Sequence, residues 1–500
     1  MFVLLLKREV FGHFMTGRFY IATLICVLLV VPSTAALISD YERRLSSYQE
    51  AVKTHRKETL RSETYSVLRL WVDRPPNPLS ILNQGLDRSL GNTLEIYHGL
   101  VPTLGDLQSH SAENPFLNLF SSIDLVLIFQ TVLSLLALLF AYDSVASERQ
   151  RGTLRLMMSA PVRRGVILFA KYTAALICLI LPLSISLLVF VILLLDSGLI
   201  VWNIVDFLPI IGVFGTSVIY LSIFYLIGLL LSTLSHRAST ALMLSIFVWV
   251  TLTFIYPNVT IFTIKQLWRT SDTRESAFHE IQQIWEGFRR DQTAFLKNDP
   301  VDGEDWRFNM SVFGRISFYD VDSRTLKYVK VLAIRWGWIE EEDQKQIPHV
   351  KNYHQFIEPL RIRAAEKTWL VRKKVMDATY VRQARVTENL LRLSPTVIYD
   401  LATEALAGTR FHNINAFIVQ ARQYRQAVVE YFYDENAFGA REWFAFDRQK
   451  VDWGSLPVFS FQREVFPENL KRAIPDVALL IIMNFILFLG TLLIFTKQAV

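Results

Sequence analysis

Cysteine is nearly absent from this sequence, which has only 2 in 500 residues, Cys26 and Cys178. Both lie in apolar runs, where cysteine behaves as a small hydrophobic residue, so a disulfide scaffold is excluded. Charged residues are also scarce at 20%, while 52% of residues are hydrophobic and the mean hydropathy is +0.29. Such a composition argues against a purely soluble enzyme and against a disordered chain.

Complete catalytic motifs are missing as well. The sequence has no Gly-x-x-x-x-Gly-Lys-Ser/Thr motif, so it lacks the loop that cradles ATP phosphates. The segment beginning His279-Glu280 approaches a zinc-protease motif, but Gln283 stands where the second histidine ligand is needed. We therefore expect a chain that is not itself an enzyme and binds no metal or cofactor of its own.

What the sequence does have is six long apolar runs. A hydrocarbon core about 30 Å thick needs roughly 20 residues of helix. The runs cover residues 19–38, 123–142, 166–195, 207–231, 238–256 and 477–495. They predict a polytopic α-helical membrane protein with six transmembrane helices. The first run has a rival interpretation as a cleaved signal peptide, because Thr34-Ala35-Ala36 is similar to a cleavage site.

The basic residues between these runs predict the orientation. They are Lys7, Arg8 and Arg18 before the first run, Arg149, Arg151, Arg155, Arg163 and Arg164 after the second, Arg237 after the fourth, and Lys497 at the end. The loop between the third and fourth runs has Asp196 and Asp206 but no lysine or arginine. By the positive-inside rule, both termini and residues 143–165 are cytosolic. The net charge of +6 is then a topological signal, and no nucleic-acid partner is expected.

Two long segments, residues 39–122 and 257–476, then fall on the extracytoplasmic side. We expect them to be mainly α with some β. After residue 40, apolar residues at helical spacing among many charged residues predict a stalk helix that continues the first span. Residues 356–392 predict one or two basic helices. That basic stretch has two interpretations, a binding surface for an anionic ligand or a solvated helix face paired with nearby acids.

The loop after the second span is the most informative part of the sequence. Gly152 is placed to end the helix of span two, and Thr153 to begin a short helix that Pro161 ends. A short amphipathic helix at the membrane surface either docks into another protein or lies on anionic lipid.

This loop resembles the coupling region of ABC-2-type transporter permeases. The matching residues are Glu148, Arg149, Gly152, Thr153, Leu154, Pro161, Val162, Arg164 and Lys171. Residues 1–18, with Leu6, Lys7, Arg8 and Glu9, resemble the cytosolic elbow helix of that family. The two large inserts resemble a subgroup that includes permeases of gliding-motility and nitrous-oxide-reductase maturation systems.

The resemblance implies a permease subunit of the bacterial plasma (inner) membrane, paired with a second permease copy or paralogue and surrounded by lipid. It implies that a cytosolic ABC ATPase subunit, which holds the ATP and Mg²⁺, docks on the coupling region. The residues expected to couple to that subunit are Glu148, Arg149, Arg151, Gly152, Thr153, Leu154, Pro161 and Arg164, with Lys7, Arg8 and Glu9 on the elbow helix.

Two functions remain open from sequence. The chain is either an exporter permease or a non-transporting transducer that moves its outer domains to act on an extracytoplasmic protein. Gln130 and Asn484 are polar residues within spans and therefore candidates for a translocation path. The other interpretation of such amides is a hydrogen bond between helices.

Overall fold

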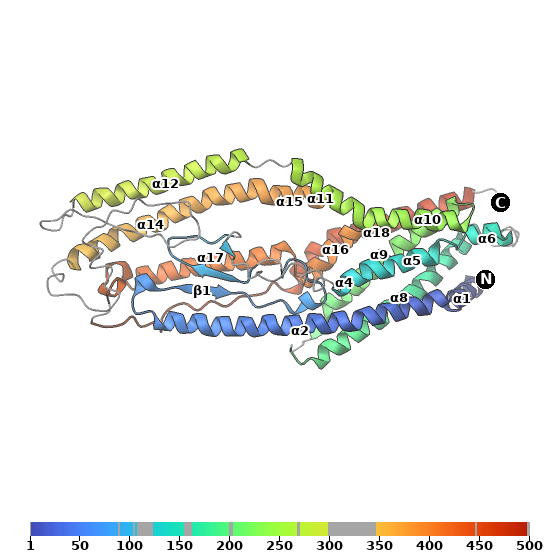
Figure 1. Cartoon of the computed structure of the whole chain (residues 1–500), viewed down its shortest axis with the longest axis horizontal. Helices are drawn as coiled ribbons and strands as arrows, with labels where there is room; N and C mark the ends of the chain where they lie inside the picture. The colour runs from blue at the N-terminus through green and yellow to red at the C-terminus, as the bar shows by residue number, and fades with distance from the viewer. Residues whose placement is uncertain are drawn as a thin grey trace.

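The computed structural model describes residues 2–88, 91–103, 106–107, 124–154, 163–199, 204–267, 271–298, 347–445 and 448–497. Figure 1 shows an elongated molecule with a helical bundle at one end and a second body of helices at the other. Both termini lie at the far end of the bundle. The strands described are β1 (Leu70–Asp73) and β2 (Thr93–Ile96), which pair antiparallel.

Six helical segments of the described chain are long and apolar enough to cross a membrane. They are α2 (Gly17–Arg61), the run of α4 (Leu125–Ile128), η4 (Phe129–Leu133), α5 (Ser134–Ala141) and α6 (Ala146–Gln150), then α8 (Arg164–Asp196), α9 (Leu208–Leu234), the run of α10 (Ala238–Val250), η6 (Thr251–Ile255) and α11 (Tyr256–Leu267), and α18 (Phe466–Lys497). The predicted polytopic helical fold is confirmed. A short helix, α1 (Phe2–Phe14), precedes α2 and packs on α8.

One span helix differs from the prediction. Span two does not continue as one helix to Gly152, because a turn at residues 142–145 separates α5 from α6. The overlong third run forms the single 33-residue helix α8, which continues through Pro182. At 1.5 Å per residue α8 is about 50 Å long, more than the roughly 30 Å of a hydrocarbon core.

One of the span helices, α2, continues into the second body (Figure 1). Helix α2 has 45 residues and is therefore about 68 Å long. Its first half is apolar and its second half charged, which matches the stalk predicted from the sequence. Because α2 is one unbroken helix, the bundle and the second body share a stiff element.

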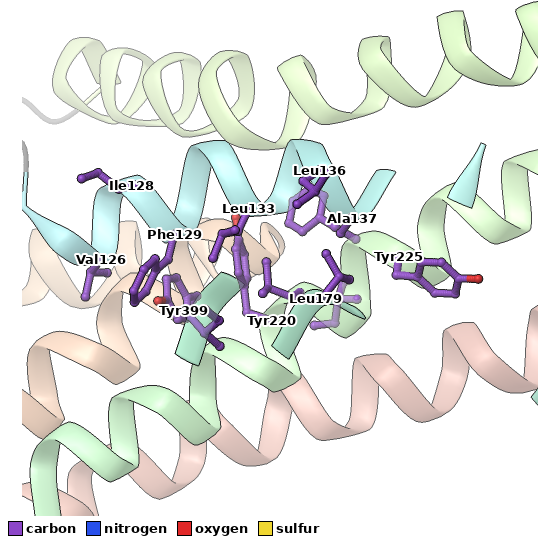
Figure 2. Close-up of a cluster of buried hydrophobic side chains, with 14 of the residues drawn as sticks. Val126, Ile128, Phe129, Leu133, Leu136, Ala137, Leu179, Tyr220, Tyr225 and Tyr399 are labelled. Atoms are coloured by element: carbon purple, nitrogen blue, oxygen red, sulfur yellow. The ribbon is translucent and has the colours of Figure 1, made fainter. Parts of the chain in front are cut away.

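The bundle core is built where α4, η4 and α5 meet α9. Figure 2 shows Phe129 and Leu133 pointing toward Tyr220. A Cβ placed on Gly228 of α9 would lie 2.6 Å from the Cβ of Ala141, so only glycine permits this approach of α9 to α5. Close packing of this kind replaces the hydrophobic effect as the force between helices inside a bilayer.

The second body packs around aromatic residues. Its helices are α12 (Ser271–Asn298), α14 (Ile347–Met376), η8 (Asp377–Val381), α15 (Arg382–Leu391) and α17 (Phe411–Asp434), with short turns η1 (Tyr65–Val67), η2 (Pro78–Ile81), η9 (Ala437–Gly439) and η10 (Arg441–Trp443). Trp443 is 1% exposed and lies against Phe432 and Phe438. Residues of both predicted inserts contribute to this aromatic core.

A charged group is buried within that aromatic core. Glu358 lies 2.8 Å from Nε2 of His98, 3.2 Å from Nδ1 of His354 and 2.9 Å from Nε of Arg361. Burial lowers the pKa of both histidines. Burial alone would raise the pKa of Glu358, but Arg361 and the two imidazoles hold it well below its usual value. The buried carboxylate is therefore ionised and paired with arginine.

The basic stretch after residue 356 is divided between buried pairs and exposed charges. Its ion pairs are Arg361–Glu358, Arg372–Asp106 and Arg392–Asp476. Its exposed cations include Arg363, Lys367, Lys374, Arg382 and Arg385. Pairing with nearby acids thus accounts for part of the stretch, and binding of an anionic ligand by the rest stays a prediction.

Helix α16 (Pro395–Ala407) belongs to the second insert in sequence but packs on the spans α9 and α18. Ile398 and Tyr399 are fully buried and Leu406 is 1% exposed. Burying each such side chain stabilises a fold by about 1.5–3 kcal/mol. The docked position of α16 is therefore strongly favoured.

Two acids of α16, Asp400 and Glu404, oppose this docking. Burial raises the pKa of both carboxyls, and the charge of Asp124 raises the pKa of Asp400 further. A folded-state pKa above the unfolded value means that the folded state binds more protons, so stability falls as pH rises through that window. Asp400→Asn should therefore raise the melting temperature at pH 8 by about 2–4 °C and much less at pH 5. Exposed Asp434→Asn is the control. A larger rise in melting temperature at pH 5 than at pH 8 for Asp400→Asn would contradict the expected direction of the pH dependence.

Candidate coupling site

A buried lysine joins three helices at the end of the bundle that carries the termini. Nζ of Lys171, in α8, donates to Oε1 of Glu9 in α1 at 2.9 Å and to Oε1 of Glu148 in α6 at 2.8 Å. The lysine side chain is 3% exposed and the two carboxylates about a fifth exposed. We call this arrangement the Lys171 clasp. It brings α1, the predicted elbow helix, together with the predicted coupling motif, although Glu9 and Glu148 are 139 residues apart in the sequence.

The position of α6 is fixed by a serine of α9. Ser232 Oγ accepts from the backbone N–H groups of Val145 and Ala146 at 3.1 and 3.0 Å, and it donates to the carbonyl of Tyr142. These bonds satisfy donors at the start of α6 that have no partner within the helix. Arg149 adds a bond from Nη1 to the carbonyl of Ser235 at 3.1 Å. Helix α6 is thus attached to α9 as well as to α8.

Gly152 ends α6, as the sequence predicts. Its φ of +75° is in the left-handed region, which a residue with a Cβ rarely adopts. Arg151, Gly152 and Thr153 are exposed, whereas Leu154 is 4% exposed. Thr153 Oγ1 donates to the carbonyl of Glu148 at 3.2 Å. The exposed turn therefore follows directly after the clasp residue Glu148 and is hydrogen-bonded to its backbone carbonyl.

The other predicted coupling residues are placed as follows. Arg164 donates from Nη1 to the carbonyl of Thr496 at 2.8 Å, which ties the start of α8 to the end of α18. Lys7 and Arg8 are exposed on α1. Pro161 and most of the predicted short helix lie outside the described residues. The site is thus an exposed cationic surface above a buried clasp.

Gln130 and Asn484, the candidates for a translocation path, both make hydrogen bonds between elements. Gln130 donates from Nε2 to the carbonyl of Thr396 at 3.3 Å. Asn484 donates from Nδ2 to the carbonyl of Ile219 at 2.9 Å and accepts from Ser222 at 2.5 Å. Both amides thus contribute to packing in this conformation, and their place on a path stays a prediction.

Part of this geometry could be predicted from the sequence. Glu148 and Lys171 belong to the motif that carries the resemblance, but nothing in the spacing shows that Glu9 joins them. Ser232 was missed altogether, because a serine near the end of an apolar run carries no distinctive signal. Among the described residues, no group of three or more His, Cys, Asp or Glu side chains is arranged to hold a metal ion.

A comparison with known families decides the identity. The pattern described as ABC-2 family transporter protein matches residues 4–498. The chain belongs to the ABC-2 transporter family. No curated protein matches this chain. The match covers nearly the whole chain, so residues 4–18 and 143–165, where the sequence predicts the elbow helix and the coupling loop, lie within it.

Membership in the ABC-2 family makes this chain a membrane transport component. A permease of this family implies a cytosolic ABC ATPase partner, and its members often form dimers. In that setting the Lys171 clasp joins α8 to α1 and α6, and Figure 1 shows α1 and α6 at the end of the bundle that carries both termini.

Proposed function

We propose that this chain is the permease subunit of an ABC-2 exporter and that a separate ATPase subunit binds the surface formed by Lys7, Arg8 and residues 151–154. The observation that carries the proposal is the Lys171 clasp. It joins the exposed turn after α6 to the elbow helix and to span three through two buried ion pairs. A force applied to that turn therefore reaches two helices at once.

The direction of transmission follows from what α6 touches. Its start is held by Ser232 of α9, and Glu148 is held by Lys171 of α8. Tyr225 of α9 also donates to the backbone carbonyl of Lys171 at 3.2 Å. An ATPase that closes on ATP and pushes the turn would thus displace the cytosolic ends of spans two, three and four together. Such a change requires that the partner contact the two conformations differently.

The proposed setting is a bacterial inner membrane with both termini in the cytosol. The arginines near α6 support this orientation by the positive-inside rule. A second permease copy or a paralogue would complete the pore, and lipid would surround the exposed apolar faces of α2, α10 and α18.

A second candidate is a transducer that transports nothing and moves the second body against an extracytoplasmic protein. In the proposed orientation the second body lies outside the membrane, and we call it the outer body. The specific observation in its favour is that α2 runs from the bundle into the second body without a break. A cargo whose export depends on this chain would decide for the permease.

The proposed coupling is tested at the turn after α6. Gly152→Val forces a β-branched residue into a left-handed backbone, and Glu148→Ala removes one ion pair of the clasp. We expect each change to lower permease-stimulated ATPase activity at least tenfold. Exposed Lys57→Ala on the stalk is the control. Unchanged ATPase activity and co-purification in both variants would refute the coupling assignment.

A further inference from the structure

Helix α16 lies among the spans although its neighbours in sequence belong to the outer body. Tyr399 stacks on Tyr220 of α9 with ring centroids 4.3 Å apart. Both side chains are labelled in Figure 2. The Tyr399 hydroxyl is 2.7 Å from Ser217 Oγ, also in α9. A Cβ on Gly212 of α9 would lie 3.1 Å from Leu406. These contacts join α16 to span four over most of its length.

The residues that flank α16 are fixed to span six by two arginines. Asp476 of α18 is 1% exposed. Its carboxylate accepts from Nε of Arg392 at 2.7 Å and from Nη1 of Arg410 at 3.3 Å. Arg410 also donates to Glu388 of α15 at 2.6 Å. The residues on either side of α16 are thus attached to the same acid of a span.

The end of α16 is fixed to the first insert through residues 77–87, which we call the collar loop. Asn77 Nδ2 donates to the carbonyls of Ala407 and Gly408 at 2.8 and 2.9 Å. Asn83 Nδ2 donates to Thr403 Oγ1 at 3.0 Å. An asparagine side chain here serves carbonyls that the helix end leaves without partners.

The collar loop in turn holds the stalk and span two. Asp87 is 1% exposed and accepts from Nη1 of Arg44 in α2 at 3.0 Å. The backbone N–H of Gln84 donates to Asp124, the residue that caps α4, at 3.0 Å. Spans one, two, four and six therefore all meet at α16 or at the loop that holds it.

We propose that α16 and the collar loop are a joint that transmits displacement of the spans to the outer body, which makes the outer body a moving part of the ATP-driven cycle. The inference rests on the proposed function, because the ATPase supplies the displacement. Helix α16 stays docked throughout, since its apolar side chains are buried among the spans. Motion then passes into α15 and α17, which begin or end within four residues of α16.

The test measures a distance between the outer body and span three in the permease–ATPase complex in nanodiscs. Spin labels are placed at Val458→Cys and Leu188→Cys, which are 86% and 60% exposed, after Cys26 and Cys178 are replaced by alanine. Trapping with ATP and vanadate should shift the distance in the otherwise native chain. The double change Asn77→Ala and Asn83→Ala should reduce that shift to less than half while ATPase activity stays within twofold. Asn298→Ala, at an exposed position, should leave the shift unchanged.

A cross-link distinguishes a permanent joint from a plug that must leave its place. In a variant that carries both Gly212→Cys and Leu406→Cys, oxidation should form a disulfide that fixes α16 to span four. If α16 is a permanent joint, the oxidised form should keep ATPase activity within twofold of the reduced form. This comparison remains a test even if the asparagine variants fail to fold. Loss of activity on oxidation with recovery on reduction would overturn the joint. ATP hydrolysis with a fixed outer body would overturn it too, whereas failure to form any complex would overturn the proposed function and this inference with it.

Discussion

Replacing Lys171 with methionine should destabilise the chain by about 3–5 kcal/mol, because removing one partner of a buried ion pair leaves uncompensated charge behind. Here two carboxylates, Glu9 and Glu148, would face each other around an apolar side chain of similar length. The free energy of unfolding can be measured in micelles by pulse proteolysis. We also expect the elbow helix α1 to become sensitive to protease, since the clasp is its polar attachment to α8.

The same loss should shrink when the carboxylates are neutralised. In a Glu9→Gln, Glu148→Gln background, Lys171→Met should cost less than half as much, because no charge is then left unpaired. Exposed Lys57→Ala should change stability by no more than about 0.5 kcal/mol. Equal losses for Lys171→Met in both backgrounds would show that the lysine acts through packing rather than charge.

Glu358→Gln should destabilise the outer body by a similar amount, about 3–5 kcal/mol, because it leaves the buried Arg361 without its counter-ion. The amide also keeps only one acceptor where the carboxylate serves both His98 and His354. Hydrogen exchange of α14 is the measurement, since the lost pair lies inside that helix. The bundle helices should exchange as before.

A matched change elsewhere in the outer body separates charge from composition. Glu95→Gln in β2 alters an exposed carboxylate and should shift stability by less than about 0.5 kcal/mol. Exchange in α14 that is equally fast in both variants would contradict a stabilising role for the buried carboxylate.

The membrane part of the fold could be predicted because its signal is local. An apolar run of about 20 residues has no alternative to a helix in lipid, and the helical spacing after residue 40 extended α2 into a stalk. The end of α16 at Gly408 depends on equally local chemistry, since glycine takes the left-handed φ of +67° there. These features depend on residues a few positions apart.

The contacts that join distant segments could not be predicted. Lys171 meets Glu9 across 162 residues, and Glu358 meets His98 across 260. The sequence also places α16 in an outer domain, and only packing shows that Tyr399 lies on Tyr220 of a span. A single sequence shows which residues are polar within apolar surroundings, but partner choice is a property of the folded arrangement.

The most direct test of the account asks on which side of the membrane the turn above the Lys171 clasp lies. In a chain without native cysteines, Thr153→Cys lies on the turn after α6 and Val458→Cys lies in the second body, next to Pro457, whose carbonyl accepts from Tyr424 of α17; both positions are exposed. A membrane-impermeant maleimide applied to spheroplasts should label Val458→Cys at once and Thr153→Cys only after permeabilisation. Labelling of Thr153→Cys in intact spheroplasts, with Val458→Cys protected, would place the coupling surface out of reach of any cytosolic ATPase and contradict the account.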